Sequence, residues 1–197
     1  MRRAFTLLEL IIAAAILGGV MAAISMSLRS ASRVATAIDL RGDLNAQAWN
    51  SVRLIAEAVR NGQVTSVDTT NGIIIYKTVT DLSSSTVLRN ATPTTVARVT
   101  VTEGGRTYRR LEMTTGTLKV QLAQEVATAF IATDSVSLPQ YLLNAPSYPG
   151  FLVAKIGNMV VIGVTLEQQD PSGAKASDGS PAQFRASALT QVMLRNS

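Results

Sequence analysis

The first part of the chain is an apolar run in which a single residue is charged. The 24 residues from Phe5 to Leu28 contain Glu9 as their only acid and have no basic residue. At a rise of about 1.5 Å per residue, such a helix reaches about 36 Å, which is enough to cross a hydrocarbon core of about 30 Å. Arg2 and Arg3 precede the run and favour a cytoplasmic N-terminus. The pattern therefore predicts a membrane-spanning helix over residues 5–28.

A secretory signal peptide is a competing interpretation of this run. The apolar region of a signal peptide usually has about 7–15 residues and is followed by a small-residue cleavage site. The run here is longer, and the charged leader before it, residues 1–4, is very short. Arg29 and Arg33 beyond the run weaken the predicted orientation without reversing it. An uncleaved protein with a single membrane span is a further interpretation of the same residues.

Apolar positions continue at helical spacing through residues 29–61. They form one stripe with Trp49 and Ala56 beside it; the stripe consists of Val34, Ile38, Ala48, Val52, Ile55 and Val59. Asn61 and Gly62 supply a stop signal. We therefore expect one helix from about Phe5 to about Arg60, with Gly42 as its interior weak point. The stripe is expected to pack on a sheet, with Trp49 as an ordinary core residue.

From Val64 onward the apolar pattern has a period of two, which is typical of β-strands. Two clear strands flank Gly104-Gly105, and another turn is expected at Thr115-Gly116. The other expected strands are residues 72–80, 126–133, 157–169 and 184–197. The proline-containing residues 137–151 and the polar residues 168–183 are expected to be loops. The sequence thus predicts an α+β fold, with the long helix packed on an antiparallel β-sheet head of residues 62–197.

The composition argues against an enzyme. The chain has no cysteine and no histidine, which removes Ser-His-Asp and Cys-His nucleophile pairs and every imidazole metal site. The acidic residues are scattered, and the spacing between Asp170 and Asp178 lacks an EF-hand pattern. The net charge of +5 is mild, and no basic run contains interleaved aromatic residues. We expect no catalytic residues, no cofactor and no metal site.

Glu9 has two interpretations. A carboxylate at the centre of a spanning helix costs about 2.5–3.5 kcal/mol, but Glu9 is near the end of the run and can reach the headgroups as a tolerated interfacial acid. The second interpretation is that the chain is cut between Ala4 and Phe5. The new amine would lie one helical turn from Glu9, and in a bundle of such helices the amine of one subunit can meet the Glu9 carboxylate of another. This pairing offsets the desolvation of both charges and fixes the axial stagger.

The stretch A-FTLLEL, with basic residues before it and IIAAAILGG after it, closely resembles the class III signal of type IV prepilins and type II secretion pseudopilins. This resemblance implies cleavage after Ala4 by the prepilin peptidase, N-methylation of Phe5, and a step in assembly that depends on Glu9. It covers the first 30 residues and defines the expected segments: a leader (1–4), an assembly helix (5–28) and an amphipathic continuation (29–61). Two features depart from the family pattern. Ala4 replaces the usual Gly, and no Pro precedes Pro93, whereas many major pilins have one in the membrane helix.

Small residues within the apolar run favour close helix packing. Ala15, Gly19 and Ala23 are spaced four residues apart, as are Ala14, Gly18 and Ala22. Gly and Ala are also common in membrane helices without such a role. Because Gly18-Gly19 weakens the helix by up to about 2 kcal/mol relative to Ala-Ala, we expect any local loosening during polymerisation to occur there.

The C-terminal half has a second resemblance. Residues 118–196 are similar to the end of PilW-like minor pilins and J-type (PulJ-like) pseudopilins: a strand VTLEQQ, a polar loop, and a closing strand ending in VMLRN. LAQEVATAFIA resembles the preceding strand of these proteins, in which a buried Val and Phe bracket a short turn. The C-terminal disulfide loop of major pilins is absent, because the chain has no cysteine.

These resemblances imply a minor pilin of a type IV pilus, which primes assembly or lies at the filament tip. Its partners would be the prepilin peptidase, other major and minor pilins or pseudopilins, and the inner-membrane assembly platform. The precursor would be a single-pass inner-membrane protein with a periplasmic head. The alternatives are a minor pseudopilin of a type II secretion system, an unprocessed single-span protein, and a DNA-binding tip subunit of a competence pilus. The DNA role would use Arg106, Arg109 and Arg110, for which a solvated strand face is the simpler interpretation.

Overall fold

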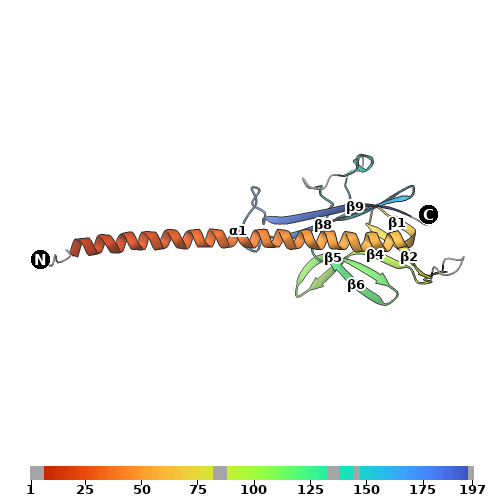
Figure 1. Ribbon diagram of the computed structural model, residues 1–197, viewed down its shortest axis with the longest axis horizontal. Helices are drawn as coiled ribbons and strands as arrows, with labels where there is room; N and C mark the ends of the chain where they lie inside the picture. The colour runs from red at the N-terminus through yellow and green to blue at the C-terminus, as the bar shows by residue number, and fades with distance from the viewer. Residues whose placement is uncertain (1–6, 82–87, 133–137, 144–146, 195–197) are drawn as a thin grey trace. The chain divides into compact units, whose positions relative to one another are not determined.

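The computed structural model describes residues 7–81, 88–132, 138–143 and 147–194. Contacts divide the chain into two units, Met1–Leu40 and Arg41–Ser197. One helix, α1, spans Leu7–Asn61, in agreement with the predicted long helix (Figure 1). The strands are β1 (Gly62–Asp68), β2 (Ile73–Asp81), β3 (Leu88–Arg89), β4 (Thr94–Glu103), β5 (Arg106–Thr115), β6 (Leu118–Ala123), β7 (Phe151–Ile156), β8 (Met159–Gln169) and β9 (Gln183–Met193), with a short 3-10 helix, η1, at Gln140–Leu142.

The C-terminal part of α1 is the part that packs on strands. Its buried residues are Leu44, Ala48, Ser51, Val52, Ile55, Ala56 and Val59. The Ser51 hydroxyl lies 2.9 Å from the carbonyl oxygen of Leu122 on β6 and 2.7 Å from that of Gln47. A helix face made of Ala48 and Ser51 is small enough to bring the helix close to the strand. The α+β fold predicted from the sequence, a long helix against antiparallel sheets, is confirmed.

Two residues of the predicted stripe are exposed, and so is Trp49 beside it. Burial along α1 begins at Leu44, and Val34 and Ile38 remain 57% and 63% exposed. Trp49 is 45% exposed, so the prediction that it is a core residue is wrong. It follows Ala48, which is fully buried, and one residue corresponds to a turn of about 100° around the helix axis. The large indole is therefore turned away from the face that approaches the strands.

The helix ends where the sequence predicts, but for a different reason. α1 ends at Asn61, and β1 begins at the next residue, Gly62. A Cβ atom at Gly62 would lie 2.9 Å from the carbonyl oxygens of both Ala58 and Lys77. Gly62 is not among the residues with positive φ. Glycine is required here because two backbone segments approach closely, rather than because the chain needs a left-handed conformation.

The first sheet is an antiparallel meander with the strand order β1-β2-β4-β5-β6, and β3 pairs with β2 at its side. β4 and β5 pair continuously from Thr94 opposite Thr115 to Glu103 opposite Arg106. Gly104 and Gly105 join them with φ values of +58° and +79°. Positive φ at both central residues is what a tight type I′ hairpin requires, so the predicted turn is confirmed.

The second sheet has the order β7-β8-β9, and Figure 1 shows it as a group of arrows separate from β4, β5 and β6. β8 is the central strand and is buried from Val160 to Leu166 on both of its faces. This burial explains its continuous apolar sequence, which predicts a strong strand. β9 is confirmed as the closing strand, and β7 is an additional strand that the sequence analysis does not identify.

Residues 124–132, the linking segment, connect the two sheets. The Val126 N–H donates to the carbonyl of Arg109 on β5 at 2.8 Å, whereas the Ala127 N–H donates to that of Thr165 on β8 at 2.9 Å. The strand predicted over residues 126–133 is therefore wrong for the described part of that range, which forms only isolated bridges at Val126 and Ala129. Successive backbone groups bond to different sheets, so no continuous ladder forms. Val126 and Phe130 are nevertheless buried, as the resemblance implies.

Two glycines allow the linking segment to pack closely. A Cβ atom at Gly150 would lie 2.0 Å from the carbonyl oxygen of Ala127, and one at Gly163 would lie 2.7 Å from the Phe130 ring. Phe130 belongs to a buried cluster with Leu142, Leu152, Ala154 and Val161. The segment is thus held between the two sheets both by backbone hydrogen bonds and by its own apolar side chains.

Candidate functional site

The first candidate site is the apolar surface of α1 from Leu7 to Leu28. Every residue of this stretch is exposed, with Leu7 at 78% and Ile24 at 50%. Within the described residues, α1 is the one helix that is long and apolar enough to cross a membrane, and a signal sequence has the same properties. An apolar surface of this length is stable only when lipid or other apolar helices cover it.

Glu9 lies in the first described turn of α1 and is exposed. It is the one charged residue on the described part of the apolar surface, residues 7–28. A negative charge near a helix N-terminus is favoured by the helix dipole. Ala4 and Phe5, the predicted processing residues, lie outside the described residues, so the cleavage and methylation site stays a prediction.

The small residues of the apolar run form part of an uninterrupted helix. α1 continues through Gly18 and Gly19, and a Cβ atom at either position would meet nothing within 4 Å. Ala15, Gly19 and Ala23 repeat every four residues and so lie along one side of the helix. This side offers a path for a neighbouring helix to approach closely, which is the role predicted for these residues.

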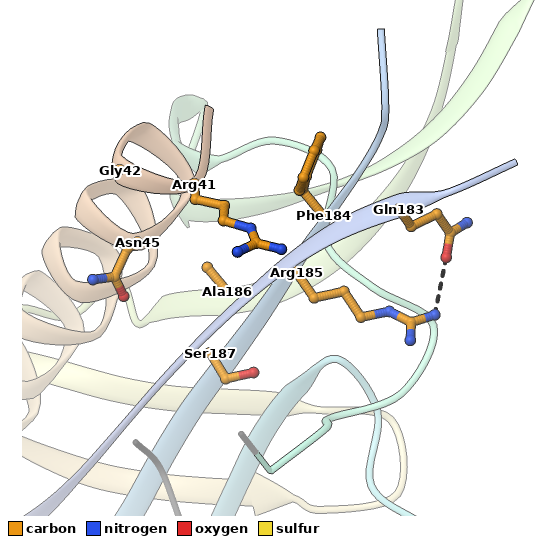
Figure 2. A pocket seen from close by; sticks show the side chains of 8 residues that line it. All are labelled: Arg41, Gly42, Asn45, Gln183, Phe184, Arg185, Ala186 and Ser187. Carbon is orange, nitrogen blue, oxygen red and sulfur yellow. Dashed lines mark hydrogen bonds between the residues drawn. The ribbon is translucent and has the colours of Figure 1, made fainter. Parts of the chain in front are cut away.

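A groove of about 560 Å³ lies between the C-terminal part of α1 and β9 in the second unit (Figure 2). The Arg41 guanidinium is 5.3 Å from the centre of the Phe184 ring. Arg185 is turned toward the opposite side, where it donates to Gln183 at 2.9 Å and to Glu167 at 2.6 Å. Because the two guanidinium groups do not converge, the groove lacks the geometry of an anion site.

The three arginines considered for DNA are held by contacts within the head. Arg106 forms an ion pair with Glu125 at 2.8 Å. Arg110 forms ion pairs with Glu112 and Glu103, and these hydrogen bonds and charges raise the pKa of Arg110. Arg109 instead donates to the Thr128 hydroxyl at 3.0 Å. Two of the three charges are therefore compensated, and the hairpin does not present a continuous basic strip.

The loop with Asp170 and Asp178 is held by local hydrogen bonds. Asp170 accepts one from the Ser172 N–H at 2.8 Å. Asp178 accepts hydrogen bonds from the Ser180 hydroxyl and N–H, which lower its pKa. In the described residues, no group of three or more acidic, histidine or cysteine side chains could hold a metal ion. Both carboxylates thus act as turn acceptors in this loop.

A pocket that the sequence analysis does not anticipate lies beside the linking segment. It has a volume of about 520 Å³, and its polar lining includes Arg98, Thr69, Thr70, Thr128 and Ser147. Arg98 is spaced along β4 like any other strand residue, so the sequence carries no local signal for it. The one available indication was that Arg98 and Arg109 lie on the two strands of the predicted hairpin, at nearly opposite positions.

Comparison with protein-family models, with curated proteins and with solved structures finds no match for this chain. The architecture is therefore described from the chain itself. It combines a long N-terminal helix, apolar and exposed over its first part, with antiparallel sheets packed against the C-terminal part of that helix. This is a pilin-like architecture.

Proposed function

We propose that the protein is a minor pilin of a type IV pilus. The observation that supports this most strongly is the apolar surface of α1, residues 7–28, which is fully exposed and carries Glu9 in its first described turn. A helix with this surface is suited to two environments in succession, a lipid bilayer and the core of a helical filament. The β head supplies the surface that distinguishes one subunit from another.

The proposed mechanism is lateral packing of apolar helices in which Glu9 sets the register. After cleavage between Ala4 and Phe5 by the prepilin peptidase, the methylated amine of Phe5 would pair with the Glu9 carboxylate of a neighbouring subunit. Removing two charges from water costs several kcal/mol for each ion, and their pairing in a dry bundle offsets that cost only at the correct stagger. The helix side with Ala15, Gly19 and Ala23 would allow close approach. The role contains no catalytic step, and a separate ATPase would drive assembly.

In this proposal the precursor is anchored in the inner membrane by residues 5–28. Its N-terminus faces the cytoplasm, where the leader of residues 1–4 is removed, and its head lies in the periplasm. Assembly through the inner-membrane platform then transfers the same helix from lipid to the pilus, beside other major and minor pilins. Both steps use one surface, so a polar substitution within it is expected to impair anchoring and assembly together.

A minor pseudopilin of a type II secretion system would use the same helix and the same Glu9 chemistry. The genes next to this one separate the two roles, since a pilus and a secretion system have different accompanying components. A DNA-binding tip subunit is less well supported, because Arg106 and Arg110 are paired with carboxylates. A gel-shift assay without a salt-sensitive shift would count against that role.

The test is incorporation of a Glu9→Gln variant into filaments. Membrane and sheared-filament fractions are compared for the wild type, for Glu9→Gln, and for the control Glu57→Gln. We expect Glu9→Gln to reach the membrane at a normal level and to be lost from filaments, because removing one partner of a buried ion pair costs about 3–5 kcal/mol. Glu57 pairs with Arg53 on the exposed face of α1, so the control should assemble normally. Normal incorporation of Glu9→Gln would overturn the proposed mechanism.

A further inference from the structure

The pocket beside the linking segment lies where four parts of the head meet. Arg98 comes from β4, Thr128 and Ala129 from the linking segment, and Ser147, Tyr148 and Pro149 from the chain leading into β7; Thr69 and Thr70 complete the lining from the turn after β1. The linking segment is fixed in place here by hydrogen bonds from the Phe130 N–H to the Tyr148 carbonyl and from the Gly150 N–H to the Thr128 carbonyl. The pocket is thus formed by backbone that the fold holds firmly.

Two arginines are brought together at this pocket. In the β4–β5 register, Arg98 is opposite Leu111 and Thr100 is opposite Arg109. Arg98 and Arg109 are therefore diagonal neighbours on the same face of the sheet, a separation that long side chains can bridge. Both reach the same residue: Arg98 Nη1 donates to the Thr128 carbonyl at 2.8 Å, and Arg109 Nη1 donates to the Thr128 hydroxyl at 3.0 Å.

Among the described residues, no acid pairs with either of these two positive charges. Within the described residues, neither Arg98 nor Arg109 forms an ion pair, whereas Arg106 and Arg110 on the same hairpin both do. Burial and the charge of Arg109 lower the pKa of Arg98, because both disfavour its positive charge. Asp68 begins the nearby turn, but its carboxylate accepts hydrogen bonds from Thr70 and Asn71.

Several hydrogen-bond donors of the lining residues have no described partner. Arg98 uses Nη1 for the carbonyls of Ala127 and Thr128, which leaves Nε and Nη2 without a hydrogen bond in the described structure. The hydroxyls of Thr69, Thr70 and Ser147 likewise make no hydrogen bond to described residues. A guanidinium presents its donors in a planar fork that matches the oxygens of a carboxylate or phosphate.

We propose that this pocket binds an oxyanion, the phosphate or carboxylate group of a small hydroxylated molecule. Arg98 would hold the anionic group, the charge of Arg109 would add to the attraction, and the three hydroxyls would contact the rest of the ligand. This inference concerns the head alone and does not depend on the proposed role in a filament.

The test is isothermal titration of the full chain in a neutral detergent with inorganic phosphate, glucuronate and glucose. The first two carry an oxyanion, and glucose carries hydroxyls without charge. The variants are Arg98→Gln and Arg109→Gln, and the matched control is Arg106→Gln, an arginine of the same hairpin that is paired with Glu125. Ser147→Ala is a second pocket variant, chosen because the Ser147 hydroxyl makes no hydrogen bond to the described residues.

We expect saturable binding of phosphate and glucuronate at one site and no binding of glucose. Arg98→Gln should weaken binding by about tenfold or more, since hydrogen bonds to a charged group are among the stronger ones, and Arg109→Gln should weaken it less. Ser147→Ala should weaken glucuronate binding severalfold, and Arg106→Gln should leave binding unchanged. Absence of saturable binding by either anion, equal binding of glucose, or an equal loss in Arg106→Gln would overturn the proposal.

Discussion

The hydroxyl groups of Thr165 on β8 and Ser187 on β9 lie 2.8 Å apart, and both side chains are buried. The Ile131 N–H donates to the Thr165 hydroxyl at 3.0 Å, and the Ser187 hydroxyl donates to the Ile131 carbonyl at 2.7 Å. The remaining proton, on Thr165, is therefore directed to Ser187. The two hydroxyls satisfy both backbone groups of Ile131 and fix the end of the linking segment to the second sheet.

Replacing Thr165 with Val should destabilise the head. The substitution keeps the shape of the side chain but leaves the Ile131 N–H without its acceptor, and we expect a loss of about 1–3 kcal/mol in the free energy of unfolding. Thr100→Val is the control, because Thr100 is an exposed threonine on β4 and its change should stay within about 0.5 kcal/mol. Urea denaturation of the full chain in detergent measures both; equal stabilities of the two variants would contradict the buried hydroxyl pair.

Two glycine substitutions should have opposite effects. Gly150→Ala places a methyl group where the Ala127 carbonyl oxygen would be 2.0 Å away, so the linking segment cannot keep its position. Gly42→Ala, in contrast, adds a methyl group within α1. Apart from the backbone of the helix itself, no atom lies within 4 Å of that position. The first variant should fail to fold or lose much of its stability. The second should gain about 0.5–1 kcal/mol, measured by the same denaturation assay.

That result for Gly150 depends on steric contact alone, because Gly150 is not among the positive-φ residues. A Gly150→Ala variant with wild-type stability would show that the linking segment is not packed against residue 150. A Gly42→Ala variant that is less stable than wild type would show that the interior of α1 is more crowded there than the structure indicates.

Burial along α1 predicts an unequal response to alanine substitution. Ile55 is fully buried, and Ile55→Ala should cost about 2–5 kcal/mol. Trp49 is the larger side chain but is 45% exposed, so Trp49→Ala should cost about 1 kcal/mol. Denaturation midpoints at constant m-value provide the comparison. If Trp49→Ala were the more damaging change, the indole would have to lie in the core, as the sequence pattern alone suggests.

Alkaline pH should act through Tyr76. Its ring is buried, its hydroxyl donates to the Met113 sulfur at 3.1 Å, and burial raises its pKa above the ordinary value. The unfolded chain ionises a tyrosine near pH 10 while the folded chain keeps Tyr76 neutral, so the contribution to stability is complete below about pH 10 and falls as the pH rises further.

The Tyr76→Phe variant isolates this effect. Relative to wild type it should gain stability between pH 9 and pH 11, by up to about 1.4 kcal/mol per pH unit above pH 10. Tyr108, whose pKa is raised by its hydrogen bond to Glu103, is present in both proteins and cancels in the comparison. A stability difference that does not change with pH would contradict a buried, neutral Tyr76.

Much of the fold could be predicted because its signals are local. The apolar period identifies α1, β4, β5, β8 and β9, and Gly104-Gly105 marks a hairpin whose two residues both require positive φ. The linking segment could not be predicted, since Val126 bonds to β5 and Ala127 to β8, partners that lie many residues away in opposite directions along the chain. A β-branched and aromatic sequence predicts a strand but does not specify a single sheet as its partner.

The candidate sites also differ in whether a local stretch of sequence predicts them. Glu9 and the small residues around Gly19 are recognised within one short stretch of sequence, and the structure places them on one exposed helix. The Arg98 pocket is assembled from β4, the linking segment and the chain before β7, so no stretch of sequence contains its pattern. Trp49 is exposed because it lies one residue, about 100° around the helix axis, from the buried Ala48. An apolar stripe in the sequence does not show this difference.

The most direct test of the proposed function is the N-terminal peptide of the chain recovered from the sheared-filament fraction, identified by mass spectrometry. The account predicts a peptide that begins at Phe5 and carries one methyl group on its amine, with residues 1–4 absent. A peptide that retains Met1, or one that begins beyond the apolar run of residues 5–28, would contradict it.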